Sequence, residues 1–230
     1  MLVASLLCLC ALWAPESTEA QANQDSGAEL RLQIVSSLPG KHLAVPAVAW
    51  LEPLTGTPAL PFNPNRPYTL LQKNRTFTPH LLVIPVGSVV RFPNADPFFH
   101  NVFSLYKGKR FDLGFYEAGS SRSVRFDRPG VSFIFCNIHP EMNAVVLALE
   151  TNDYAVSNSA GEAEISHLTP GKYRVNFWFQ NSSPELLAAL SREIDVAGNV
   201  RIEDVIVPEV TVSMTHKNKF GQDYEIKSTY

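Results

Sequence analysis

The sequence Phe-Ile-Phe-Cys-Asn-Ile-His-Pro-Glu-Met, residues 133–142, begins as an apolar run and ends in potential metal ligands. Cys136 closes the run, His139 follows three residues later, and Met142 follows after three more. A Pro-Gly turn precedes the run, and residues 143–150 return as a second apolar run. This pattern predicts two strands joined by a short loop that carries all three side chains and can wrap around one ion.

A second strand-like stretch, Phe-Phe-His-Asn-Val at residues 98–102, supplies another histidine, His100. Two imidazoles, one thiolate and one thioether form the ligand set of a trigonal copper site with a weak axial sulfur. The sequence therefore predicts one copper site built from two separate segments. A buried inert cysteine and a core histidine are the alternative interpretations of Cys136 and His100 taken singly.

The spacing of apolar runs predicts an all-β protein. From residue 77 onward, short strands recur at intervals of about ten residues between Gly, Pro and Asn turns, which is typical of a β-sandwich. Residues 28–52 are interpreted as two further strands at the start of this domain. A second β unit is expected to begin near residue 151, with one or two helical turns within residues 184–191. The polar residues 216–230 are expected to form a loose tail.

The N-terminus has the character of a secretory signal peptide, assigned to residues 1–20. Its apolar run, residues 1–13, is shorter than the roughly 20 residues that span a bilayer, so the mature protein is expected to have no membrane span and to be periplasmic or secreted. Retention of the segment as an anchor is the alternative. Cys8 and Cys10 lie within it, which leaves Cys136 as the only mature cysteine and excludes an intramolecular disulfide.

Charge and the remaining histidines add little to the functional prediction. The formal net charge of -3 argues against nucleic acid as a partner. A basic turn and four further histidines are interpreted as surface or structural features: Lys107, Lys109 and Arg110, and His42, His80, His167 and His216.

These motifs together resemble the cupredoxins, the plastocyanin/amicyanin-like blue copper proteins. The loop of residues 136–142 has the short spacing and the His-Pro pair of the amicyanin loop. The wider pattern, Phe-Pro-Asn at 92–94, His-Asn-Val at 100–102 and Cys-Asn-Ile-His at 136–139, is similar to bacterial methylamine utilization proteins. The resemblance implies a cupredoxin Greek-key β-sandwich over residues 28–150.

The resemblance also implies roles for individual residues around one mononuclear type 1 copper ion. The equatorial ligands are expected to be His100, Cys136 and His139, with Met142 as the axial ligand. Asn101 matches a residue that ties the two ligand segments together, and Asn137 is expected to support the loop. His139 is the expected partly exposed edge through which electrons enter and leave.

The C-terminal unit, residues 151–215, resembles the smaller carboxypeptidase regulatory-like (transthyretin-like) β-sandwich. The resemblance is carried by the turn residues Gly161 and Pro170-Gly171 and by Tyr173, which starts a core strand. Nothing in this unit is catalytic, and a packing or adhesion role is expected.

These features favour an exported, non-enzymatic copper protein that shuttles single electrons between redox partners whose identity the sequence does not give. The alternatives are a copper protein for storage, delivery or sensing, a metal-free structural β-sandwich, and an enzyme with Cys136 as nucleophile and His139 as base. The apolar flanks of Cys136 predict a raised thiol pKa, which counts against the nucleophile.

Overall fold

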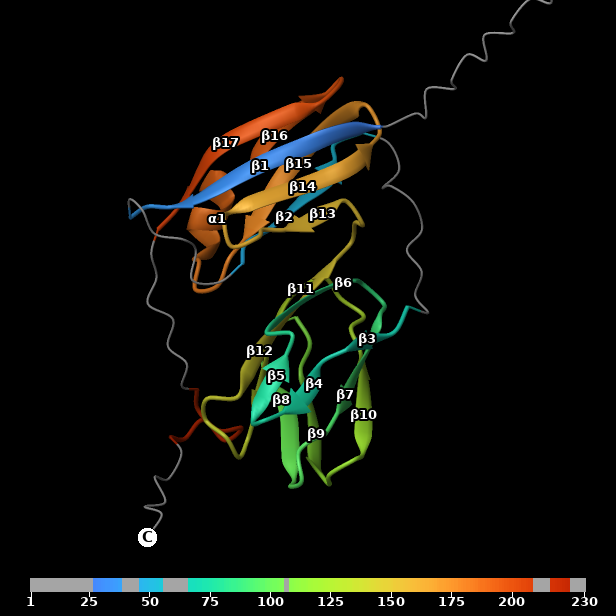
Figure 1. The fold of residues 1–230 in the computed structure, drawn as a ribbon, viewed down its shortest axis with the longest axis vertical. Helices are drawn as coiled ribbons and strands as arrows, with labels where there is room; N and C mark the ends of the chain where they lie inside the picture. Colours follow the sequence, from blue (N-terminus) through green and yellow to red (C-terminus); the bar gives the residue numbers. More distant parts are fainter. Residues whose placement is uncertain (1–26, 39–45, 56–65, 106–107, 209–215, 224–230) are drawn as a thin grey trace, which may run out of the picture.

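The computed structural model describes residues 27–38, 46–55, 66–105, 108–208 and 216–223, and it forms two β units (Figure 1). The proposed signal peptide, His42 and Lys107 lie outside these residues. The all-β prediction and the sandwich arrangement are confirmed. Within the described ranges, no helix combines the length and apolarity needed to cross a membrane.

The first unit is a sandwich of a five-stranded and a three-stranded sheet. Strand order is β6-β12-β11-β8-β9 in the larger sheet and β10-β7-β3 in the smaller one, with β4 and β5 as a separate pair. Strands β6 and β12 are parallel, and β11 pairs antiparallel with both β12 and β8. The bounds are β3 (Tyr68–Thr69), β4 (Leu71–Lys73), β5 (Thr76–Thr78), β6 (Leu81–Pro85), β7 (Val89–Pro93), β8 (His100–Ser104), β9 (Phe111–Tyr116), β10 (Ser121–Arg125), β11 (Gly130–Cys136) and β12 (Asn143–Leu149).

The second unit packs two sheets, with strand orders β14-β1-β17 and β13-β2-β15-β16, around its own core. Its single described helix, α1 (Pro184–Leu190), starts at Ser183, whose side chain accepts a hydrogen bond from the N–H of Leu186. The strands are β1 (Ala28–Ser36), β2 (Val48–Pro53), β13 (Tyr154–Val156), β14 (Glu162–Leu168), β15 (Gly171–Trp178), β16 (Arg192–Val196) and β17 (Val200–Val207).

The two N-terminal strands, expected as additions to the copper domain, pair instead within the C-terminal unit. Strand β1 lies between β14 and β17, and β2 lies between β13 and β15. The alternating side chains of Leu30, Leu32 and Ile34 fill the C-terminal core. Alternation in a sequence predicts a buried strand face but not the sheet that buries it, so the pattern of residues 28–52 does not identify the unit to which they belong.

The contact between the two units explains the unbroken apolar run of β12. Ala144, Val146 and Ala148 face the core of the first unit. Val145 and Leu147, on the opposite face of the strand, pack into a third apolar cluster shared with β2 and β15 of the second unit. A strand covered on both faces has no solvated side, so its sequence does not alternate.

His80 forms a polar connection between the units. Its Nδ1 lies 3.2 Å from the carbonyl oxygen of Asn143, and its Nε2 lies 3.0 Å from Oε1 of Gln180, a buried residue that follows β15. His80 is therefore a structural residue, consistent with its predicted role.

Candidate metal site

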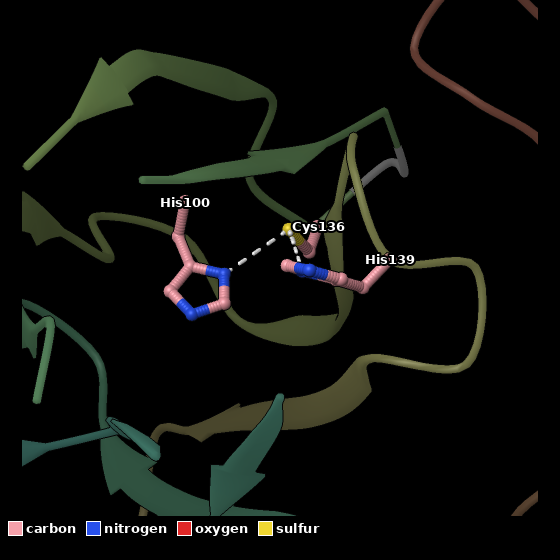
Figure 2. Close-up of side chains that lie close together, drawn as sticks. All are labelled: His100, Cys136 and His139. Carbon is pink, nitrogen blue, oxygen red and sulfur yellow. Dashed lines mark hydrogen bonds between the residues drawn. The ribbon is translucent and has the colours of Figure 1, made fainter. Parts of the chain in front are cut away.

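Three of the four predicted ligands, His100, Cys136 and His139, converge at the ends of two neighbouring strands (Figure 2). Cys136 is the last residue of β11 and His100 is the first of β8, and the antiparallel register pairs Cys136 with Val102. The loop that joins β11 to β12 carries His139 and Met142. Two backbone hydrogen bonds close this loop, from the N–H of Cys136 to the carbonyl of Met142 and from the N–H of Met142 to the carbonyl of His139, both 3.1 Å long.

Three donor atoms face one another at the spacing expected for ligands of one ion. Sγ of Cys136 lies 3.6 Å from Nδ1 of His100 and 3.6 Å from Nδ1 of His139, and all three donors lie within 4.8 Å of one another. Sulfur and nitrogen ligands at about 2.3 and 2.0 Å from a metal, at angles near 110–120°, lie about 3.5–3.8 Å apart. The donor set and its spacing therefore fit a single transition-metal ion held by a thiolate and two imidazoles.

Burial of the candidate ligands is uneven. His100 and Cys136 are fully buried, and Met142 belongs to the same core cluster as Cys136. His139 is only partly buried, and the neighbouring Ile138 is exposed. The donor set is therefore least shielded from solvent on the side of His139.

The environment of Cys136 favours the thiolate. Burial raises the pKa of the thiol, but His100 and the backbone N–H groups of Asn101, Ile138 and His139 outweigh burial and lower the pKa below its ordinary value. This result is the opposite of the raised pKa predicted from the apolar flanks. The apolar residues before Cys136 belong to the buried part of the strand. The sulfur lies at the end of the strand, where backbone N–H groups are directed at the sulfur.

The structure reveals one supporting residue that the sequence did not indicate, Asp96. Its buried carboxylate lies 2.9 Å, through Oδ2, from Nε2 of His100. The N–H groups of Asn74 and Arg75 donate to the same carboxylate at 2.6 and 3.0 Å, and the N–H of Asp96 donates to Oδ1 of Asn94 at 3.0 Å. A carboxylate on the outer ring nitrogen of a ligand histidine fixes the tautomer and orientation and makes the other nitrogen a better donor.

The two histidines differ in their affinity for a proton. Burial lowers the pKa of His100, but Cys136 and Asp96 outweigh it and raise the pKa above the ordinary value. Burial and the nearby charges of His100 and Arg75 lower the pKa of His139. Because metal ligation requires an unprotonated Nδ1, a metal ion and a proton would compete for Nδ1 of His100.

Asn101 and Asn137, both expected to support the site, contact different parts of the chain. The side chain of Asn101 donates to Oδ1 of Asp112 on β9 at 2.7 Å, and its backbone N–H faces the sulfur of Cys136. Oδ1 of Asn137 accepts the backbone N–H of Lys219 at 2.9 Å. Asn101 thus contacts the cysteine through its backbone, whereas its side chain binds β9 and not the ligand loop.

Aromatic side chains border the site. The ring of Phe98 lies 5.3 Å from the ring of His100 and 5.6 Å from that of His139, and the guanidinium of Arg75 lies 5.5 Å from the Phe98 ring centroid. The next residue, Phe99, is 54% exposed. The ring of Phe98 therefore contacts both imidazoles, and an exposed aromatic side chain follows it in the sequence.

Two of the other predicted surface features are placed by the structure. His167 is exposed, and Lys109 forms an exposed ion pair with Asp127. His216, in contrast, is partly buried against Phe135. The described part of the expected loose tail, residues 216–223, lies beside the ligand loop (Figure 1). A polar composition does not indicate whether a segment finds a docking site on its own fold.

Comparison with known proteins finds similarity among solved structures. No protein-family model matches the chain, and no curated protein matches it. A purple cupredoxin from Nitrosopumilus maritimus is 26% identical, with 36% of this chain and 99% of that chain covered and a TM-score of 0.33. Amicyanin from Paracoccus versutus is 19% identical, with 43% and 97% covered and a TM-score of 0.34. A copper-containing nitrite reductase from Thermus scotoductus is 27% identical with a TM-score of 0.35, and the match covers 43% of this chain and 25% of the reductase.

Proposed function

We propose that the chain binds one mononuclear type 1 copper ion and carries single electrons between larger redox proteins. The ligands are His100, Cys136 and His139, with Met142 as the weak axial donor. The observation that supports this best is the buried sulfur of Cys136 facing two imidazole Nδ1 atoms, each 3.6 Å from it. A copper ion bound there would supply a one-electron couple with a thiolate bond that favours electron transfer.

The role of the protein is to keep the donors fixed while the oxidation state changes. Asp96 holds His100 by its outer nitrogen, and backbone hydrogen bonds close the loop around His139 and Met142. Rigid donors reduce the rearrangement that accompanies each electron transfer. Partly exposed His139 is the route for the electron, and a partner docks on the surface where His139 and exposed Ile138 lie.

Storage, delivery or sensing of copper uses the same ligands and is the second candidate. Fully buried His100 and Cys136 argue against it, because a delivery site must release its ion to an acceptor. The enzyme alternative requires Cys136 to attack a substrate, yet its sulfur is fully buried and faces two histidines. Export to the periplasm or the exterior remains part of the proposal and depends on the N-terminal segment.

Electron self-exchange tests the proposed role. Mixing oxidised and reduced copper-loaded protein is expected to show fast exchange by NMR line broadening, because the donors hold one geometry in both states. The reduced protein is also expected to retain its copper in the presence of a Cu(I) chelator. Slow exchange together with release of copper on reduction would favour storage or delivery.

A further inference from the structure

The described part of the C-terminus, residues 216–223, folds into a compact turn. The side chain of Asn218 accepts hydrogen bonds from the N–H groups of Phe220 and Gln222, at 2.9 and 3.0 Å. The carbonyl of Asn218 accepts the N–H of Gly221 at 2.9 Å. The segment therefore has an ordered backbone with which to contact the rest of the molecule.

The first contact of this segment is between aromatic rings next to the ligand loop. The imidazole of His216 lies 4.2 Å from the ring of Phe135 and 6.2 Å from that of Phe103. Both phenylalanines lie on the outer face of the larger sheet, and Phe103 is only 1% exposed. The backbone carbonyl groups of His139 and Met142 also lie near the imidazole. The ring thus packs against the residue that precedes Cys136 and lies against the loop that carries two other proposed ligands.

The second contact links the segment to both ligand-bearing parts of the chain. The backbone N–H of Lys219 donates to Oδ1 of Asn137 in the ligand loop at 2.9 Å, and its ammonium lies 2.7 Å from Oδ2 of Asp112. The other oxygen of Asp112 accepts the side chain of Asn101, which directly follows His100. Lys219 is therefore connected to the loop and, through Asp112, to β8.

We propose that residues 216–223 act as a clamp that holds the ligand loop, residues 137–142, in its metal-binding conformation. The inference rests on the proposed copper site for its effect on the ion, although the contacts themselves involve only the chain. Because the clamp contacts the loop from outside the sheet, it limits opening of the loop and hence loss of a bound ion.

A double variant, His216→Ala with Lys219→Ala, tests the clamp in the full-length chain. It removes the ring from Phe135 and the ammonium from Asp112, and it keeps the backbone hydrogen bond from Lys219 to Asn137, so it tests the two side-chain contacts of the clamp. Lys217→Ala with Gln222→Ala is the matched control, because both side chains are exposed and lie in the same segment. The measurements are the rate of copper loss to a strong chelator, the reduction potential, and hydrogen exchange of the amides of residues 137–142 in the copper-free protein.

The clamp variant is expected to take up copper with an unchanged colour but to lose it about tenfold faster than the control, as for weakened support of metal ligands elsewhere. Its loop amides are expected to exchange faster, whereas the amides of β1 and β15 in the second unit stay protected. Equal copper loss and equal loop exchange in the two double variants would overturn the clamp. If the wild type takes up no copper, the proposed function fails, and loop exchange in the copper-free protein still decides the clamp.

Discussion

Cys136→Ala is expected to abolish the visible colour of the copper-loaded protein. In the proposed site the thiolate would make the covalent, delocalised contact to copper, and the intense absorption of such sites comes from charge transfer out of that sulfur. Two imidazoles and a thioether remain in the variant, so residual copper would give only a pale spectrum. Absorption spectra at one equivalent of Cu(II) measure the effect, and an unchanged intense band in the alanine variant would refute the assignment of Cys136.

Met142→Leu is the matched control for that experiment. It replaces a buried thioether in the same core cluster with a side chain of similar volume, so the fold is preserved. The thiolate and both imidazoles remain, and the colour is expected to persist. The reduction potential is expected to rise, because a weak axial donor stabilises Cu(II) more than Cu(I). The pair of variants therefore separates loss of the chromophore from general damage to the core.

Asp96→Asn is expected to weaken copper binding by about 10–100-fold and to raise the reduction potential. Three donors converge on the wild-type carboxylate, namely the N–H groups of Asn74 and Arg75 and the Nε2 of His100. An amide has one acceptor oxygen, so at least one of these donors faces an NH₂ group. Loss of a buried negative charge beside His100 also disfavours Cu(II) relative to Cu(I).

Copper titration and redox potentiometry measure both effects, with Asp127→Asn as the control. Asp127 also accepts a hydrogen bond from a cationic group, Lys109, but at an exposed position. The control is expected to leave affinity and potential unchanged. Equal affinities for the two variants would show that Asp96 has no role in supporting His100.

The hydrogen bonds to Asp96 also predict how the stability of the copper-free protein depends on pH. Burial raises the pKa of Asp96, but hydrogen bonds from Arg75, His100 and Asn74 outweigh burial and leave it below 3.8. A carboxyl with a depressed folded-state pKa adds stability above its unfolded pKa, and that stability is lost as pH falls through the folded pKa. The stability difference between wild type and Asp96→Asn is therefore expected to shrink below about pH 3.8.

The convergence of His100, Cys136 and His139 follows largely from local sequence information. Cys136, His139 and Met142 lie within one loop, and the apolar run before them predicts the strand whose end positions the sulfur. His100 required one long-range assumption, that its strand neighbours β11, and the register of β8 and β11 agrees with it. The coordinating roles of these side chains stay predictions until an ion is bound.

The features that sequence reasoning missed depend on contacts between distant parts of the chain. Asp96 lies in an Asn-Ala-Asp-Pro turn, where a short polar residue has an ordinary conformational explanation. β1 alternates like any half-buried strand, and only its pairing with β14 and β17 assigns it to the second unit. Residues 216–223 are polar, and their place beside the ligand loop follows from Phe135 and Asn137, more than 75 residues earlier.

The most direct test of the central claim is the electron paramagnetic resonance and visible spectrum of the protein loaded with one equivalent of Cu(II). Coordination by the thiolate of Cys136 and the imidazoles of His100 and His139 predicts an intense visible charge-transfer band and a compressed copper hyperfine splitting. A pale solution with the wide hyperfine splitting of tetragonal copper, or no uptake of copper at all, would contradict it.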